Sequence, residues 1–121
     1  MTYRGDETTG FQSPAQDYIE SVIDLSRLLD LRAPGIYPLR VLGDGWRGRG
    51  IHHGDIVVAN AAAEPASGRI CAVFAHGEVI LATLQMKDGE WWLTPAQRPS
   101  FQVDSDVEVW GIVKALVRTK V

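Results

Sequence analysis

Short apolar runs bounded by turn-forming residues make up most of the chain after residue 35. Such runs are typical of β-strands, and here they span residues 36–42, 56–59, 70–75, 79–86, 91–94 and 107–117. Pro38 weakens the first run and places it at a strand start or a sheet edge. Asp88-Gly89 predicts a tight hairpin turn between two of the runs. We therefore predict a mostly β fold, a partly rolled antiparallel sheet with one short helix.

The helix is predicted near the start of the chain. Asp24 is a candidate N-cap, and leucines follow it at helical spacing over residues 25–29. Pro34 limits this helix to a turn or two. Residues 18–23 alternate loosely between apolar and polar side chains, so they are a candidate first strand.

Composition favours one globular domain. The chain has 121 residues, of which 45% are hydrophobic, and a formal net charge of −3. We expect a domain over residues 10–121, with a core that needs neither disulfide nor metal, after a short mobile arm over residues 1–9. The acidic balance lacks the basic footprint of phosphate binding, so direct, tight nucleic-acid binding is not expected. Two basic groups are interpreted as solvated surface: Arg47 and Arg49, and Lys114, Arg118 and Lys120.

Cys71 is the sole cysteine, so no internal disulfide can form, which suits a reducing cytoplasm. It lies in an apolar run, where a small buried hydrophobe is expected. The N-terminus has no apolar segment of signal-peptide length, and no apolar run approaches the ~20 residues of a membrane helix. We expect a cytoplasmic protein that does not contact membranes.

The histidines do not form a metal motif. His52 and His53 are neighbours, so their side chains project differently, and His76 precedes a glycine in a predicted turn. No third ligand stands at a spacing typical of zinc sites. We interpret all three as turn and loop residues, and we predict no metal and no cofactor.

Several local sequences stand in a characteristic order. They are residues 10–20 (GFQSPAQDYIE), 23–29 (IDLSRLL), 43–46 (GDGW), 50–55 (GIHHGD), 77–86 (GEVILATLQM) and 109–113 (VWGIV). Together they resemble the processed form of UmuD proteins, which belong to the LexA/UmuD family of self-cleaving serine peptidases. The resemblance implies the β-clip-like rolled sheet of the LexA/UmuD C-terminal domain, and a homodimer.

The catalytic pair of that family is missing. Members cleave their own N-terminal arm with a serine nucleophile and a lysine base, and this chemistry needs both groups. Here Gly45 stands at the serine position and Ala82 at the lysine position. Thr83 follows Ala82 on a strand, so we expect its hydroxyl to face away from the vestigial cleft. We therefore expect a protein that is not an enzyme.

The cleavage junction has changed as well. In the family the cut follows a cysteine and precedes the glycine that matches Gly10, whereas Thr9 holds the preceding position here. The preceding arm of nine residues is also shorter than the arm of family members. Loss of the enzyme and loss of its substrate arm are consistent with a chain made near its processed form.

Aromatic and branched residues suggest a contact surface. Trp46 follows Gly45, so its ring is expected either to cover the cleft or to pack in the core. Trp91 and Trp92 are consecutive on one strand and must face opposite sides. The last strand is apolar on both faces, which indicates burial or a subunit boundary. The residues predicted for a dimer or partner interface are Trp92, Val109, Trp110 and Ile112.

The resemblance implies a role in the SOS response to DNA damage. The expected function is that of a non-catalytic subunit that binds a UmuC-like Y-family polymerase and helps it copy past lesions. A RecA-type recombinase filament and the sliding clamp are further implied partners. Three alternatives remain: a regulatory decoy that forms mixed dimers with an active UmuD- or LexA-type protein, a residual self-cleaving serine peptidase, and a fragment of a repressor.

Overall fold

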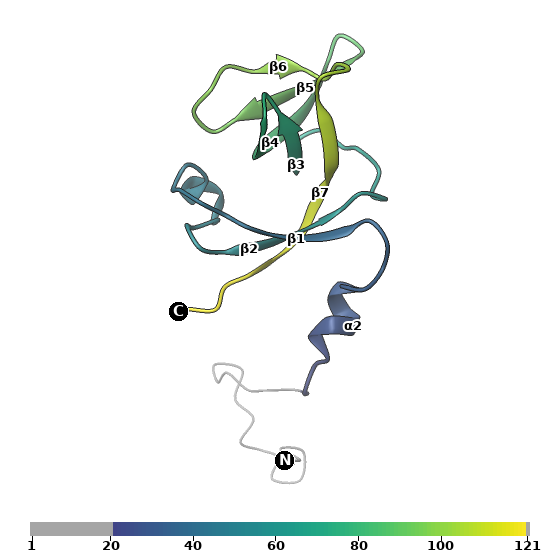
Figure 1. Cartoon of the computed structure of the whole chain (residues 1–121), viewed down its shortest axis with the longest axis vertical. Helices are drawn as coiled ribbons and strands as arrows, with labels where there is room; N and C mark the ends of the chain where they lie inside the picture. Colours follow the sequence, from purple (N-terminus) through teal and green to yellow (C-terminus); the bar gives the residue numbers. More distant parts are fainter. Residues whose placement is uncertain (1–20, 121) are drawn as a thin grey trace, which may run out of the picture.

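An antiparallel sheet accounts for most of the molecule. The computed structural model describes residues 21–120, in which seven strands lie in the order β1-β2-β7-β3-β4-β5-β6 (Figure 1). The strands are β1 (Ile36–Arg40), β2 (Ile56–Asn60), β3 (Ile70–Ala75), β4 (Glu78–Lys87), β5 (Glu90–Pro95), β6 (Phe101–Gln102) and β7 (Glu108–Val117). The helix α2 (Leu25–Leu29) and the 3-10 turn η1 (Arg47–Arg49) complete the regular structure of this part of the chain. The prediction of a mostly β antiparallel sheet with one short helix is confirmed.

Most predicted strands lie close to their predicted bounds. The run over residues 70–75 coincides with β3, and the others begin and end within a few residues of the observed strands. The short strand β6 was not predicted. Of the candidate strand over residues 18–23, residues 21–23 have no regular structure, and the remainder lies outside the described residues. The predicted arm over residues 1–9 lies outside them too.

Tight turns join β3 to β4 and β4 to β5. His76 and Gly77 form the first turn, with φ of 54° and 83°, and Asp88 and Gly89 form the second, with φ of 52° and 80°. Positive φ at both central residues is the requirement of a type I′ turn, whose twist matches that of the flanking strands. The predicted Asp-Gly turn is therefore confirmed.

The last strand, β7, joins two half-sheets. Its C-terminal part pairs with β2, from Ile112 to Val117, and its N-terminal part pairs with β3, from Glu108 to Ile112. The first half-sheet therefore consists of β1 and β2, and the second of β3 to β6 (Figure 1). β7 is a central strand, paired along both edges; Gly111 and Ile112 in its middle are buried, whereas Val109 and Leu116 are 40% and 38% exposed.

Buried side chains form two clusters, one within the second half-sheet and β7, and one between the two half-sheets. The larger cluster comprises Cys71, Val73, Ala75, Ala82, Leu84, Leu93 and Ile112. The smaller comprises Val41, Ile51, Val57 and Ile70, with Trp46 and Leu81 packed against it. Cys71 is fully buried, as predicted. Burial also raises the pKa of its thiol to about 12, so the sulfur stays protonated near neutral pH.

The helix α2 begins as predicted but does not reach the core. The Asp24 carboxylate accepts hydrogen bonds from the backbone N–H groups of Ser26 (3.1 Å) and Arg27 (3.4 Å), which confirms it as the N-cap. Leu25 and Leu28 are nevertheless exposed. The helix lies beside the first half-sheet, at the far end of the molecule from β6 (Figure 1).

Candidate functional site

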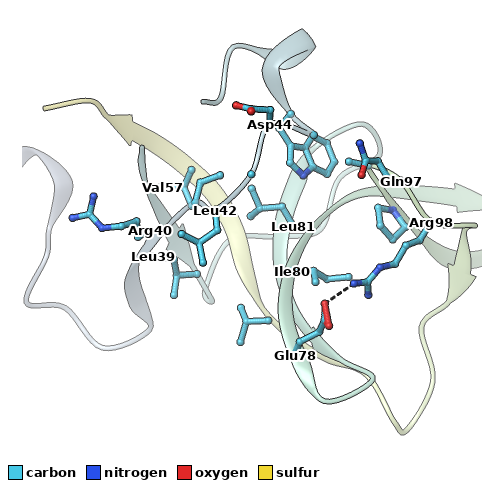
Figure 2. Close-up of a pocket in the computed structure, with 17 residues that line it drawn as sticks. Leu39, Arg40, Leu42, Asp44, Val57, Glu78, Ile80, Leu81, Gln97 and Arg98 are labelled. Carbon is cyan, nitrogen blue, oxygen red and sulfur yellow. Dashed lines mark hydrogen bonds and ion pairs between the residues drawn. The ribbon is translucent and has the colours of Figure 1, made fainter. Parts of the chain in front are cut away.

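A pocket lies between the two half-sheets. Its volume is about 530 Å³, and both half-sheets and their connecting loops contribute to its wall (Figure 2). One side is formed by residues 39–46 and Val57, and the other by residues 78–81 and 95–98. The family resemblance places the former catalytic serine in this wall, at Gly45.

Gly45 is packed tightly against the opposite side of the pocket. A Cβ atom built on Gly45 would lie 2.8 Å from the Cβ of Ala96. Carbon atoms in real side chains do not approach so closely, and the Ala96 Cβ is fixed to its backbone. Any side chain at position 45 therefore requires the loop after β5 to move.

Ala82 does not line the pocket. Its side chain is fully buried in the larger core cluster, and its carbonyl oxygen lies 3.5 Å from the Cys71 Sγ, which donates to it. Its chain neighbour Leu81 and its cross-strand partner Pro95 do line the pocket. The two positions that the resemblance aligns with the catalytic pair therefore do not share one cavity, because Gly45 lines the pocket and Ala82 is buried in the larger core cluster. Thr83 pairs with Thr94 on β5 and is not part of the pocket wall either.

The pocket wall carries few groups that could act chemically. Among the described residues that line it, none has a hydroxyl, thiol, amine or imidazole side chain. Its polar side chains are guanidinium, carboxylate and amide groups. Of these, Glu78 and Arg98 form an ion pair of 2.6 Å, which Figure 2 shows at the rim. Asp44 lies 3.8 Å from Arg47, which extends from η1.

Trp46 both lines the pocket and packs against the smaller core cluster. We expected the Trp46 ring either to cover the cleft or to pack in the core, and in the structure it does both. Trp46 follows Gly45 in the segment between β1 and β2 that contributes to the pocket wall. Apart from the chain neighbours of Gly45, the atom closest to a Cβ built at this position is the Cβ of Ala96.

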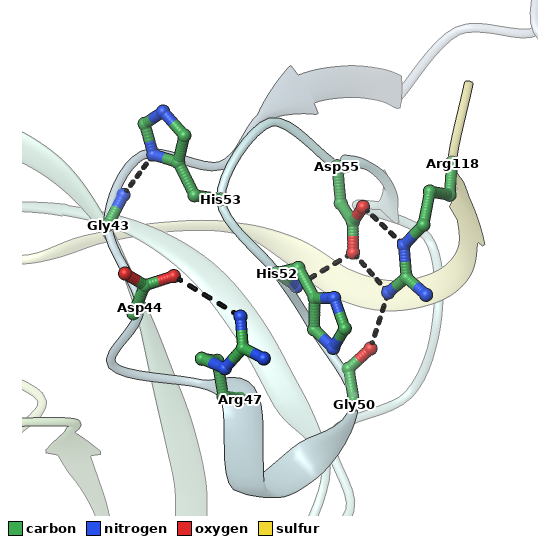
Figure 3. Close-up of polar contacts among 8 residues, drawn as sticks. All are labelled: Gly43, Asp44, Arg47, Gly50, His52, His53, Asp55 and Arg118. Carbon is green, nitrogen blue, oxygen red and sulfur yellow. Dashed lines mark hydrogen bonds and ion pairs between the residues drawn. The ribbon is translucent and has the colours of Figure 1, made fainter. Parts of the chain in front are cut away.

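The neighbouring histidines have different surroundings. The Nδ1 atom of His53 accepts a hydrogen bond of 2.7 Å from the backbone N–H of Gly43. His52 contributes its backbone N–H, which donates to the Asp55 carboxylate at 2.7 Å. Figure 3 shows these contacts in the loops beside β2. No three His, Cys, Asp or Glu side chains gather in a metal-binding arrangement within residues 21–120.

An ion pair that the sequence reasoning missed ties the C-terminus to the same loop. Arg118 donates from Nε to Asp55 Oδ1 at 2.8 Å and from a terminal nitrogen to Oδ2 at 2.7 Å (Figure 3). Asp55 is 2% exposed, and the hydrogen bond from Arg118 holds its pKa well below the ordinary value. The two residues are 63 positions apart, so no local pattern could have signalled the contact.

The residues predicted for an interface have different exposures. Ile112 is only 4% exposed and belongs to the larger core cluster, so its prediction as an interface residue is replaced by a core role. Val109 is 40% exposed, and Trp110 is half-buried. The Trp110 ring lies 6.0 Å from that of Tyr37 on β1 and donates from Nε1 to Glu108 at 2.7 Å.

Trp92, the remaining interface candidate, is half-buried on β5. The ammonium of Lys87 lies 5.6 Å from its ring centroid, in a cation–π arrangement. Trp91, its neighbour, packs against the larger core cluster. The expectation that the two indoles face opposite sides agrees with these contacts. Cleavage-junction residues Thr9 and Gly10 lie outside the described residues.

The rolled antiparallel sheet, with a pocket between its two half-sheets, defines a domain of the LexA/UmuD kind. The chain belongs to the peptidase S24-like family, whose model matches residues 2–114. It is 30% identical over 108 residues to the protein SamA of Salmonella typhimurium, which covers 89% of this chain and 77% of SamA.

Other relatives agree with this assignment. ImpA of Escherichia coli is 26% identical over 110 residues, 89% of this chain and 76% of ImpA. The LexA repressor of Methylococcus capsulatus is 39% identical over 93 residues, 72% of this chain and 46% of the repressor. Between residues 21 and 120, no helix has the length and apolar content of a membrane span.

Proposed function

We propose that the chain is a non-catalytic, UmuD′-like accessory subunit of an error-prone Y-family translesion polymerase in the SOS response. The observation that carries the proposal is the packing of Gly45 against Ala96, at 2.8 Å from the position of a Cβ atom. A serine fits there only if the loop after β5 moves. The packing around this position is thus that of a glycine, as we expect of a site without a catalytic serine.

The chemistry of the pocket wall also supports a binding role. Acyl transfer by this family needs a nucleophile and a base that takes its proton. Among its described residues the wall offers no hydroxyl or thiol nucleophile and no amine base. Cys71 is no substitute, since its thiol is fully buried and has a raised pKa.

The contact surface of the proposed subunit lies around Trp110 at the start of β7, with Val109 and Trp92 as further candidates. Tyr37 extends the surface around Trp110, since its ring lies against that of Trp110 and its side chain is 43% exposed. Partly exposed aromatic side chains are enriched at protein interfaces. We assign the homodimer or the polymerase to this surface.

Co-purification with the UmuC-like polymerase of the same genome tests the proposal. We expect a stable complex with two copies of this chain, measured by light scattering, and primer extension past an abasic site that requires it. Val109→Asp should weaken the complex. Met86→Asp is the matched control, because Met86 is 43% exposed and pairs with Trp91 on a different pair of strands.

Other results would favour the alternatives. A folded chain that binds no polymerase but forms mixed dimers with an active UmuD-type protein would replace the accessory role by that of a decoy. Incubation with recombinase filaments followed by mass spectrometry tests residual peptidase activity. Cleavage abolished by mutation of one side chain would refute the non-catalytic assignment.

A further inference from the structure

Half of the basic residues of the chain lie on segments that adjoin one another. The sequence contains twelve Lys and Arg residues. Six of them lie on η1, at the start of β3, and on β7 with the segment that follows it. We define these as the basic surface: Arg47, Arg49, Arg69, Lys114, Arg118 and Lys120.

Hydrogen bonds link the segments that carry these residues. Arg118 donates to the carbonyl oxygen of Gly50 at 3.0 Å, directly after Arg49 in the chain. Arg49 in turn donates to the carbonyl oxygen of Gly68 at 3.4 Å, directly before Arg69. These contacts bring the turn η1, the start of β3 and the C-terminal segment together.

The same chain of contacts continues to β7. Arg69 donates to the carbonyl oxygen of Val113 at 3.0 Å, and Lys114 is the next residue. The segments that carry the two basic groups therefore adjoin, and Arg69 links them through its contact with Val113 and the contact of Arg49 with Gly68. None of Arg49, Arg69 and Arg118 lines the pocket.

Carboxylates compensate little of this charge. Asp55 is buried and forms its ion pair with Arg118, and Asp44 lies 3.8 Å from Arg47. Among the described residues, Arg49, Arg69 and Lys114 have no recorded carboxylate partner within 4.0 Å. A guanidinium has five N–H donors, and each of Arg49 and Arg69 uses one of them in these contacts. The remaining donors are available to an anion.

We infer that the basic surface binds the phosphate backbone of a nucleic-acid strand. Protein partners draw most of their binding energy from aromatic and aliphatic anchors, whereas phosphate contacts alone suffice for non-specific nucleic-acid binding. Among the large hydrophobic side chains that are clearly exposed, Leu116 adjoins this surface, and it is 38% exposed. The composition of the surface therefore fits phosphates better than an acidic protein.

The interaction is weak and sensitive to salt, because the chain as a whole carries a net charge of −3. It is thus compatible with our expectation that the chain does not bind nucleic acid tightly. The inference goes beyond the proposed function and does not rest on it, since it concerns the chain alone and a surface that does not line the pocket.

Fluorescence anisotropy of a labelled mixed-sequence DNA strand, titrated with the full chain at several salt concentrations, tests the inference. We expect Arg49→Gln/Arg69→Gln to lower the slope of log affinity against log salt by about 1.4, two phosphate contacts at about 0.7 each. The variant Arg49→Lys/Arg69→Lys keeps the charge and should retain the slope. Arg27→Gln/Arg32→Gln removes the same charge near α2 and should leave binding unchanged.

Because Arg49 and Arg69 contact backbone carbonyls, their variants must first be shown to fold. Lys114→Gln/Lys120→Gln repeats the test without these contacts, with the same expected loss of slope. The inference is overturned if the control near α2 weakens binding as much as either variant, or if no binding is seen at low salt. Tighter binding of poly-glutamate than of DNA would instead assign the surface to an acidic protein.

Discussion

Arg118, near the end of the described chain, forms an ion pair with Asp55 directly before β2. The guanidinium approaches both carboxylate oxygens, at 2.8 and 2.7 Å, and also donates to the carbonyl oxygen of Gly50. The Asp55 carboxylate accepts a further hydrogen bond from the backbone N–H of His52. One ion pair therefore fixes the segment after β7, the turn after η1 and the entry to β2 (Figure 3).

This arrangement predicts an acid-sensitive contribution to stability. The hydrogen bond from Arg118 lowers the pKa of Asp55 below its ordinary value of 3.8 in the folded chain. A group with a lowered folded pKa stabilises the fold above its unfolded pKa and loses that effect as the pH falls. Thermal unfolding should therefore show the full contribution at pH 7 and a decline below about pH 4.

Variants at this pair separate its effect from general acid denaturation. Asp55→Asn should lower the melting temperature at pH 7 and flatten its dependence on pH below 4, because the titrating carboxylate is gone. Arg118→Gln should destabilise as well, since it leaves a buried carboxylate without its partner. Arg98→Gln, at the exposed pair with Glu78, is the control and should have little effect. An unchanged acid profile in Asp55→Asn would contradict the assignment.

Local patterns predict the strands well, because the turn residues and apolar runs act within a few positions of each other. Asp88 and Gly89 are an example, since the positive φ that a type I′ turn requires is favoured by these residue types. β6 was missed because Phe101–Gln102 is too short to show a period. The exposure of Leu25 and Leu28 was also beyond prediction, because helical spacing indicates an apolar face but not what covers it.

Long-range contacts carry the remaining information, and local patterns do not encode them. Apolar residues on both faces of β7 indicated burial, but its pairing with β2 and β3 joins segments distant in sequence. For the same reason Ile112 was assigned to an interface and not to the core. Two further contacts also arise only on folding. Gly45 packs against Ala96, and hydrogen bonds bring together the segments that carry the two basic groups.

The position of Gly111 on β7 leaves no room for a side chain. A Cβ atom at this position would lie 2.6 Å from the backbone carbonyl carbon of Asn60 and 2.7 Å from the backbone nitrogen of Ala61. Backbone atoms of a paired strand cannot yield, so Gly111→Ala should destabilise the fold by about 1–3 kcal/mol, as overpacking does. Urea unfolding measures the change. Gly48→Ala, where nothing lies within 4 Å, should be close to neutral, and equal effects would argue against this packing.

Cys71 should be chemically silent in the folded chain. Its thiol is fully buried, and its pKa is raised from 9.0 to about 12. At pH 8 this leaves about 1000-fold less thiolate than an ordinary cysteine, and thiolate is the reactive form. Labelling with a disulfide reagent should be slow in native buffer and fast in denaturant. Rapid labelling of the native chain would show that β3 opens readily and would reopen the question of Cys71 as a nucleophile.

The packing of Gly45 predicts a coupled response to the restoration of serine. Gly45→Ser alone should destabilise the fold by roughly 1–3 kcal/mol, because the new Cβ meets the Cβ of Ala96 at 2.8 Å. Ala96→Gly removes that obstacle, so the double variant should recover part of the loss, with a coupling energy of about 0.5–3 kcal/mol. Gly48→Ser is the control for an added hydroxyl in an open position. Additive effects of Gly45→Ser and Ala96→Gly in urea unfolding would show that the loop accommodates a serine without strain. In that case the packing of Gly45 would no longer support the proposed loss of the catalytic site. The proposal would then rest only on the absence of the serine and lysine side chains.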